Sequence, residues 1–406
     1  MCQKKKRIIL WGAGYYAGFV LRKINRQTCE IIAIVDSSNK KQGKKWEEEF
    51  VIKTPEQIVY LEYDLIVITA KDKRSISETI SNFDVSDGKI IHYWDSLDNE
   101  IFLDDEVVAL NNWKEIDKLK KYIESLFYEY GTEKCPYIKS GEALLEKMIV
   151  DKTSLVRFGD GEFEIIQNRD RPWFQKVDNM LAERLRNVLR SDDPIVNIAI
   201  AQDFQCLDQY KDECADIIRD YMSSGTRTEI VDLLDMNKTY YDAYVSRPYI
   251  IYKNTNKADK IFPLFKKLWR KRDICVVEGK YNRFGIGNDL LNDVKSVIRV
   301  ACPEKNAWSR YEEILNYVIE NIEKEVLILI SLGPTATILA YDLAQKGYQA
   351  IDIGQLDNEY DWYLMRAESR TPIKGKMVAE FVEEKDNDFC EDYEKQYRKE
   401  LVKEIV

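Results

Sequence analysis

Two acidic residues follow a short apolar run near the middle of the sequence. The run 154–158 leads directly into Gly159, Asp160, Gly161 and Glu162. Residues two apart in an extended segment project to the same side, so this pattern predicts that Asp160 and Glu162 present two carboxylates to one point. Such oxygen ligands suit Mg²⁺ or Mn²⁺ bridging a diphosphate. The alternative is a solvated acidic turn, because Asp and Gly are common turn residues.

The composition is that of a globular chain long enough for two domains. The 406 residues are 45% hydrophobic and 33% charged, with a net charge of -10 that argues against nucleic acid as a partner. The eight cysteines contain no Cys-x-x-Cys pair, so we expect neither a disulfide framework nor a zinc site, and a reducing cytoplasm fits best. Apart from residues 8–21, no apolar run approaches the roughly 20 residues of a membrane-spanning helix, so no integral membrane segment is expected.

Small residues near the amino terminus predict a nucleotide-binding type of turn. Gly12, Gly14 and Ala17 lie between a short apolar strand and a helix. Asp36 ends the next apolar run, about 20 residues beyond the glycines, where a dinucleotide-binding fold places the acid that contacts a ribose. The helix amino terminus would offer N–H groups to a phosphate. The sequence therefore predicts a Rossmann-like parallel-sheet domain over residues 1–100, with a possible nucleotide ligand.

A helical segment separates this domain from the rest of the chain. Apolar residues recur at helical spacing between 111 and 130, which predicts a helical linker over residues 101–136. Helices and strands then alternate, which predicts an α/β domain with a largely parallel sheet over residues 137–380. We expect residues 381–406 to form a charged C-terminal helix.

Three loops that follow predicted strands of the second domain have residues suited to a phosphate. Ligands of open α/β sheets bind beyond the carboxyl ends of the strands, where arginine, glycine N–H groups and helix amino termini can meet an anion. The candidate residues are Glu278, Arg283, Gly285, Gly287, Asn288 and Asp289 in the first loop, Pro303 and Asn306 in the second, and Gly333 and Thr335 in the third. Each loop alone could be a helix cap. All three together with the acidic pair favour a nucleotide-diphosphate site.

The ordered motifs between about residues 136 and 380 resemble the glycosyltransferases of the GT-D fold. The resemblance rests on segments 157–162, 247–249, 278–289, 332–336 and 348–362. It implies transfer of a sugar from a UDP-sugar to a glycan or glycoprotein acceptor, in bacterial surface polysaccharide or glycoprotein assembly. Asp160 and Glu162 would be the Asp-x-Glu motif that binds metal and diphosphate.

The same resemblance assigns further residues to the nucleotide-sugar site, namely Arg157, Gly159, Arg247 and Gln355. Gln355 is a departure, since these enzymes typically have histidine there, and His92 is the only histidine of the sequence.

The expected reaction is displacement at an anomeric carbon, which requires a base if configuration inverts. The cluster Asp357, Glu359 and Asp361 supplies candidate bases, although the same residues could simply form the acidic first turn of a helix. Two other classes of function remain open: an NAD-dependent oxidoreductase acting on a nucleotide sugar through the first domain, and a non-catalytic nucleotide-sugar sensor. A homo-oligomer is compatible with the sequence.

Overall fold

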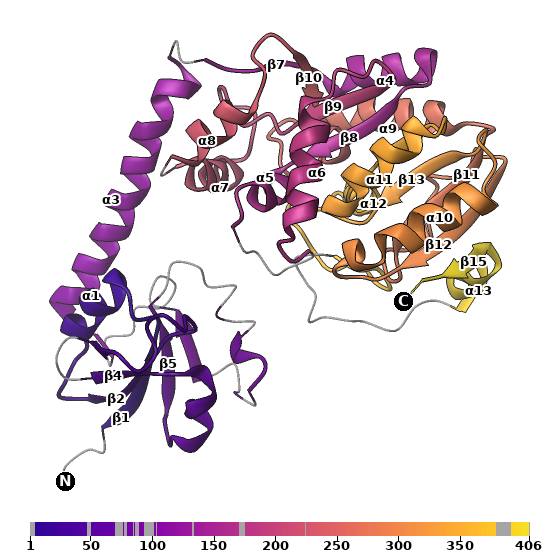
Figure 1. Ribbon diagram of the computed structural model, residues 1–406. Coiled ribbons are helices and arrows are strands. Elements are labelled where there is room, and N and C mark those ends of the chain that lie inside the picture. The colour runs from indigo at the N-terminus through magenta and orange to yellow at the C-terminus, as the bar shows by residue number, and fades with distance from the viewer. Residues whose placement is uncertain are drawn as a thin grey trace. The chain divides into compact units, whose positions relative to one another are not determined.

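The structure is a computed structural model that divides into two compact units, Met1–Lys120 and Lys121–Val406 (Figure 1). Each unit contains a sheet of mainly parallel strands with helices, which confirms the predicted α/β class. We describe the units separately. The residues that the structure describes are 5–46, 50–69, 76, 79–83, 85, 89–92, 101–102, 104–131, 134–169, 175–223, 225–378 and 391–405.

The first unit is built on a six-stranded sheet with the order β3-β4-β2-β1-β5-β6. Its elements are β1 (Lys6–Trp11), α1 (Tyr15–Lys23), β2 (Cys29–Val35), β3 (Lys45–Trp46), β4 (Phe50–Lys53), η1 (Pro55–Tyr60), β5 (Leu65–Ile68) and β6 (Ile90–His92). All of its strand pairs are parallel except β3 with β4. Ile8 and Leu10 of β1 enter one apolar cluster and Ile9 and Trp11 enter another. Both faces of the sheet are therefore covered, as is usual for parallel strands.

The second unit is built on a nine-stranded sheet with the order β15-β12-β11-β13-β14-β8-β9-β10-β7, in which every pair is parallel. The strands are β7 (Tyr137–Lys139), β8 (Ser154–Phe158), β9 (Val196–Ile200), β10 (Thr239–Asp242), β11 (Asp273–Gly279), β12 (Ser296–Cys302), β13 (Leu327–Ser331), β14 (Ala350–Asp352) and β15 (Leu401–Glu404). Because the strands share one direction, the loops after them all lie at one edge of the sheet.

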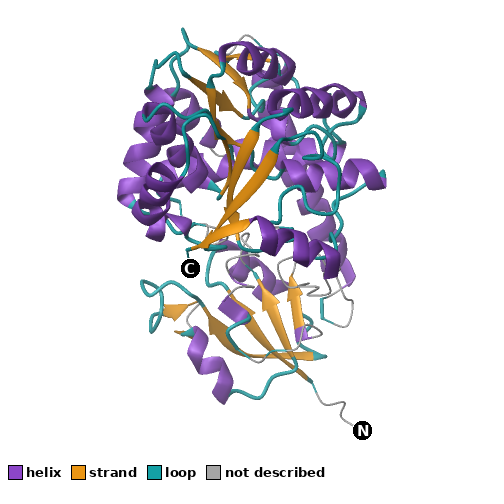
Figure 2. Cartoon of the chain, turned by 90° about the vertical axis from the view of Figure 1, so that its right-hand side faces the viewer, coloured by secondary structure: helices purple, strands orange, loops and turns teal. Residues whose placement is uncertain are grey.

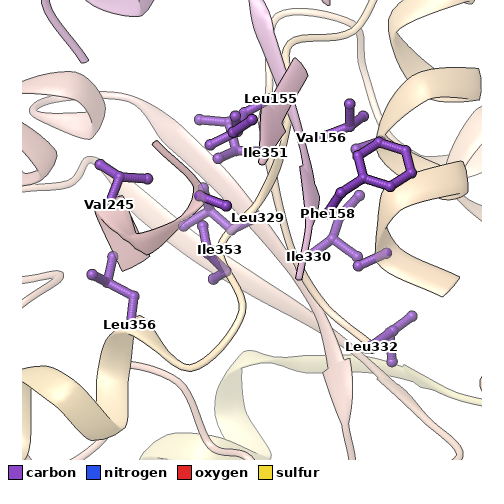
Figure 3. Packing of buried hydrophobic residues seen from close by; sticks show 14 of the residues in the cluster. Leu155, Val156, Phe158, Val245, Leu329, Ile330, Leu332, Ile351, Ile353 and Leu356 are labelled. Atoms are coloured by element: carbon purple, nitrogen blue, oxygen red, sulfur yellow. The ribbon is translucent and has the colours of Figure 1, made fainter. Parts of the chain in front are cut away.

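Helices cover both faces of this sheet, and the strands run between them in Figure 2. The helices are α4 (Gly141–Asp151), α5 (Asp160–Ile166), α6 (Asn179–Arg190), α7 (Asp212–Met222), α8 (Thr226–Leu233), η3 (Ala243–Ser246), α9 (Asn256–Trp269), η4 (Ala307–Arg310), α10 (Tyr311–Asn321), α11 (Pro334–Gln345), α12 (Leu356–Met365) and α13 (Glu391–Glu400). The central strands are buried on both sides. Figure 3 shows Leu155 near Ile351 on one side of the strands, and Val156, Phe158 and Ile330 on the other. This core fixes the ends of β8, β13 and β14.

Helix α3 (Asp104–Glu129) begins in the first unit and ends in the second. Its end is anchored to the second unit, since Tyr128 joins the large core and Glu129 pairs with Arg219 of α7 at 2.8 Å. No helix among the described residues has the length and apolarity to cross a membrane.

The chain end departs from the charged helix expected over residues 381–406. In the described part, α13 ends at Glu400 and the chain continues as β15, which pairs with β12 at the edge of the sheet. Arg299 of β12, which is fully buried, donates to Glu400 at 2.7 Å. Ile405 is buried after the strand, so apolar burial and this ion pair together favour a strand over a continued helix.

Candidate functional site

The acidic pair lies in the first turn of helix α5, and the extended loop predicted from the sequence is wrong. Glu162 turns back and its Oε2 accepts a hydrogen bond from the N–H of Gly159 at 2.7 Å. A glutamate at this position satisfies one of the N–H groups that a helix start leaves unpaired, so the helix begins directly after β8. Asp160 is exposed and Glu162 is half-buried. The two residues lie about 200° apart around the helix axis, but Glu162 turns back to the helix start, where its carboxylate is within electrostatic reach of Asp160.

Several acids share the carboxyl edge of β8 and its neighbours. Burial, followed by the charge of Asp352, raises the pKa of Glu162 to about 7, and Asp160 adds to this rise. Burial also raises the pKa of Asp203, in the loop after β9, to about 7, with a contribution from Asp160. The charge density raises the cost of ionising both groups, so this edge favours a cation.

Arg157 ties the central strands together at the same edge. From β8 it donates to the carbonyl oxygen of Asp352 at 2.9 Å and to its Oδ1 at 2.7 Å, at the end of β14. Its Nη1 donates to Oγ of Ser246 in η3 at 2.8 Å. Burial raises the pKa of Asp352, and the charge of Arg157 opposes that rise. Arg157 therefore acts as a brace of the site, because its donors are directed at protein acceptors.

Gly354 leaves the space that the Arg157 side chain occupies. Its φ is +49°, and a Cβ at this position would lie 2.2 Å from Nη2 of Arg157. We expect Gly354→Ala to lower the free energy of unfolding through two effects. The clash with Arg157 should cost about 1–3 kcal/mol, in addition to the cost of placing alanine at this positive φ. Gly225→Ala is the matched control, because Gly225 has φ +87° with no atom within 4 Å of the added Cβ. Chemical denaturation measures both, and equal losses would show that Arg157 moves aside freely.

The loop after η3 is held against helix α12. Arg247 donates from Nη2 to Oε1 of Gln355 at 3.1 Å, directly after β14. Glu359 is 1% exposed, and its Oε2 accepts from the N–H groups of Tyr249 at 3.0 Å and Ile250 at 2.9 Å. This geometry does not favour the base role predicted for Glu359, because the carboxylate is buried and its Oε2 is bonded to two backbone amides.

Glu278 and Arg283, in the predicted first phosphate loop, are used inside the protein. Glu278 is fully buried. Its carboxylate accepts hydrogen bonds from Arg299 at 2.7 Å and from the N–H of Phe284 at 2.8 Å. Arg283 donates to the carbonyl oxygen of Gly375 at 2.7 Å and pairs with Glu394 of α13 at 3.2 Å. These contacts hold Arg283 against the C-terminal helix and do not favour the phosphate role predicted for it.

The remaining residues of that loop bind helix α12. Asp357 accepts from the N–H of Gly285 at 2.9 Å and from Asn288 at 2.8 Å, and Lys376 pairs with it at 2.5 Å. Asp357 is 4% exposed and bonded to these donors, which does not favour the base role predicted for it. Gly287 packs closely under the ring of Tyr393 of α13.

Asp289 lies at the end of the same loop, on its exposed side. Its carboxylate pairs with Lys266 at 2.8 Å and accepts from Tyr360 at 2.6 Å. The hydrogen bonds from Lys266 and Tyr360 lower the pKa of Asp289. It therefore stabilises the contact between α9 and α12.

The second predicted loop packs against the chain before α6. Pro303 follows β12 and is half-buried. Asn306 has φ +57° and accepts from the N–H of Lys176 at 2.7 Å. The helix expected near Asn306 begins as the short η4 and becomes α10 only at Tyr311.

The third predicted loop does reach the acidic turn. Gly333, with φ +55°, precedes Pro334 at the first position of α11. A Cβ on Gly161 would lie 3.8 Å from Cγ of Pro334, so the starts of α5 and α11 are adjacent. Thr335 is fully buried and donates to Gln175 at 3.2 Å. The first N–H groups of a helix have no partner within the helix, so this junction can receive an anion.

Asp36, the acid next to the glycine turn of the first unit, is bonded to donors of the protein itself. Gly12 has φ +111°, Gly14 precedes α1, and Ala17 is buried. Asp36 accepts from the N–H of Ala13 at 2.7 Å and pairs with Lys41 at 2.8 Å. These contacts give Asp36 a role in holding the turn, and they do not favour the ribose contact that the oxidoreductase alternative requires.

Asp203 and Asp352 were missed from the sequence. Both follow the general rule for site residues, since Asp352 ends β14 and Asp203 lies three residues beyond β9. Their positions shortly after predicted strands could have indicated them. Their significance depends on Arg157 and Asp160, which the fold brings near them from β8 and α5.

The acidic turn fits a divalent cation that shares its coordination with a diphosphate. Within the described chain, no group of three or more His, Cys, Asp or Glu side chains forms a metal cage. Mg²⁺ is usually bound through one or two carboxylates plus substrate phosphates, and Asp160 with Glu162 match that requirement. The raised pKa of Glu162 is the electrostatic effect that a bound cation would reverse.

Comparison with known proteins gives two family matches. The family described as Glycosyltransferase GT-D fold matches residues 155–381, more than half of the chain. The family described as C2185-like, N-terminal matches residues 4–91.

Relatives and solved structures agree with the first match. The chain is 31% identical to "Probable glycosyl transferase Gly" of Streptococcus gordonii, covering 75% of this chain and 45% of that protein. It is 32% identical to "Glycosyltransferase GlyD" of Streptococcus pneumoniae, covering 66% of this chain and 32% of that protein. The chain thus spans less than half of these relatives. A structure described as "A New Glycosyltransferase (DUF1792) from Streptococcus sanguinis" is 31% identical with a TM-score of 0.63, covering 67% of this chain and all of that one.

Proposed function

Because the chain belongs to the glycosyltransferases of the GT-D fold, we propose that it transfers a sugar from a UDP-sugar to a hydroxyl group of a glycan or glycoprotein acceptor. The acceptor class follows from the resemblance of its motifs to enzymes of bacterial surface glycan assembly. We place the reaction in the cytoplasm, since cysteines such as Cys275 and Cys302 are free thiols.

One observation carries this proposal, namely the placement of the Asp160-x-Glu162 turn. The turn follows the central strand β8, and its start lies against the start of α11. A diphosphate at this edge would meet carboxylate-held metal on one side and helix N–H groups on the other.

In the proposed reaction the acceptor oxygen forms a bond to the anomeric carbon while the bond from that carbon to the diphosphate breaks. The diphosphate departs with the electron pair and takes up, directly or through water, the proton that the acceptor releases. Arg247, held at Gln355, and the first turn of α11 are the groups of this chain that would stabilise the departing charge. Glutamine at position 355 keeps the hydrogen bond that a histidine could form and cannot carry a proton.

Mn²⁺ or Mg²⁺ held by Asp160 and Glu162 would act as a Lewis acid on the diphosphate oxygens. Arg157 would preserve the shape of this site by bracing β8 against β14 through Asp352.

The direct test is release of UDP from a panel of UDP-sugars, with and without Mn²⁺, in the presence of sugar acceptors. We expect release from one UDP-sugar that depends on the metal. Binding of UDP without turnover of any UDP-sugar would favour the sensor alternative, and reduction of NAD with a nucleotide sugar would favour the oxidoreductase alternative.

We expect a fragment of residues 121–406 to fold and to bind UDP, because the proposed site lies wholly in the second unit. A fragment starting at Gly131 would lose Tyr128 from the core and would leave the half-buried Arg219 without Glu129. Removing a large aromatic side chain from a core costs about 3–5 kcal/mol, so the shorter fragment should melt at a clearly lower temperature. If the longer fragment is folded but does not bind UDP, the first unit contributes to the site.

A further inference from the structure

The loop after β9 brings a further carboxylate, Asp203, to the edge that carries the acidic turn. In the sheet, Phe158 of β8 pairs with Ile200 of β9, and the N–H of Ala201 donates to the carbonyl oxygen of Phe158 at 3.0 Å. Asp160 and Asp203 therefore leave the ends of neighbouring strands, which lie about 4.8 Å apart. Neither the sequence motifs nor the family resemblance assigns a role to Asp203.

Only one oxygen of Asp203 has a protein donor among the described residues. Its Oδ2 accepts from the hydroxyl of Tyr244 in η3 at 3.0 Å. Its Oδ1 is buried and has no hydrogen-bond partner in the described chain, and the residue is 4% exposed. A buried acceptor without a donor is costly, and in native proteins it commonly marks a functional group or a place for a bound molecule.

A second buried polar group without a partner belongs to the same region. The hydroxyl of Tyr128, at the end of α3, has no hydrogen-bond partner among the described residues. The charge of Asp203 contributes to the raised pKa of Tyr128, so the two groups lie within electrostatic reach of each other. An acceptor and a hydroxyl that do not bond to each other can both be satisfied by one hydroxyl group inserted between them.

We propose that Asp203 is a sugar-binding residue, whose Oδ1 accepts a hydroxyl group of the substrate when the site is filled. Tyr244 fixes the carboxylate through Oδ2 and leaves Oδ1 as the acceptor. Burial, with the charges of Asp160 and Asp242, raises the pKa of Asp203 to about 7, so ionisation is unfavourable until a donor arrives. This inference rests on the proposed glycosyltransfer, and it adds recognition of the sugar to recognition of the diphosphate.

The burial of Oδ1 has a consequence for binding. Because this oxygen is shielded from solvent, the loop 201–211 must shift when a sugar hydroxyl reaches it. Hydrogen exchange of this loop should therefore change on addition of UDP-glucose or UDP-N-acetylglucosamine with Mn²⁺, and should not change with UDP and Mn²⁺ if the donor sugar is the source of the hydroxyl.

The test compares Asp203→Asn and Asp203→Ala with the full-length wild type. Calorimetry measures binding of UDP and of the two UDP-sugars, and steady-state assays measure kcat and KM for donor and acceptor. We expect UDP affinity to be unchanged and kcat/KM to fall by about 10- to 100-fold, the range for a hydrogen bond to a charged group. Loss of UDP-sugar affinity identifies a hydroxyl of the donor, whereas a raised KM for the acceptor alone identifies the acceptor.

Asp208→Asn is the matched control, because Asp208 lies on the same loop and is exposed, with its carboxylate accepting from Tyr130 at 2.7 Å. Asp203→Asn should melt at or above the wild-type temperature, since it removes a buried acid, so a loss of activity would not reflect unfolding. Wild-type kinetics in Asp203→Asn and Asp203→Ala would overturn the inference and would assign Oδ1 to an ordered water. A wild type that binds neither UDP nor a UDP-sugar would overturn the proposed function as well.

Discussion

Asp160→Asn is expected to lower the rate of sugar transfer by about 100- to 1,000-fold, the range for removing one group that stabilises charge in a transition state. Asp160 is exposed at the first position of α5, so its replacement should change the thermal midpoint little. Glu162→Gln should cause a comparable loss of rate. It should also fold well, because an amide oxygen can still accept from the N–H of Gly159.

Glu162→Gln should also differ from the wild type in how its Mn²⁺ affinity depends on pH. A proton competes with the metal for a carboxylate, and the pKa of Glu162 without metal is raised to about 7. Mn²⁺ affinity of the wild type should therefore increase as pH rises toward 7 and then level off above it. Glu162→Gln should bind Mn²⁺ weakly, and its affinity should not show this increase with pH. Calorimetric titration with Mn²⁺ and UDP between pH 5.5 and 8.5, about one and a half units on either side of the raised pKa, measures this dependence.

Unchanged transfer in both variants would remove the acidic turn from the reaction. A large fall in thermal midpoint, with activity lost in proportion, would instead reduce Asp160 and Glu162 to a helix start. Glu229→Gln is a matched control, since Glu229 is an exposed acid near the amino terminus of α8 that pairs with Arg169 on the surface.

The sequence predicted the strands more securely than it predicted the use of the polar residues between them. The run 154–158 is β8, because Leu155, Val156 and Phe158 suit a strand that is buried on both faces. The conformation of Asp160 was not predictable from the same pattern. Asp-Gly-Glu can form a turn or a helix start, and the choice here depends on the bond from Gly159 to Glu162.

The glycine-rich loop after β11 illustrates a second limit. Gly285 and Gly287 have positive φ, as predicted for a special turn, but the N–H of Gly285 meets the carboxylate of Asp357. An anion is indeed bound by this loop, and it is a side chain from α12. Local sequence indicates that N–H groups converge, whereas the identity of the acceptor depends on residues about seventy positions away, a separation that backbone propensity does not encode.

The same tertiary dependence decides the role of Glu359. In the sequence it belongs to an acidic cluster next to the proposed site, which suits a base. In the fold it is fully buried, and its Oε2 is the shared acceptor for the N–H groups of Tyr249 and Ile250. That contact holds the loop that presents Arg247 to Gln355. We therefore propose that Glu359 is a positioning residue that acts through the backbone of this loop.

Glu359→Ala and Glu359→Gln separate the two roles. The alanine variant leaves the N–H groups of Tyr249 and Ile250 without their acceptor, each at a cost of about 1–3 kcal/mol, so we expect a lower thermal midpoint and weaker UDP binding through a misplaced Arg247. The glutamine variant keeps an oxygen that can accept from both, so it should retain most of the stability and kcat within about tenfold. A catalytic base would give the opposite order, with glutamine as inactive as alanine while both bind UDP normally. Measuring UDP affinity, kcat and the thermal midpoint for the two variants therefore decides whether this buried carboxylate moves a proton or holds a loop.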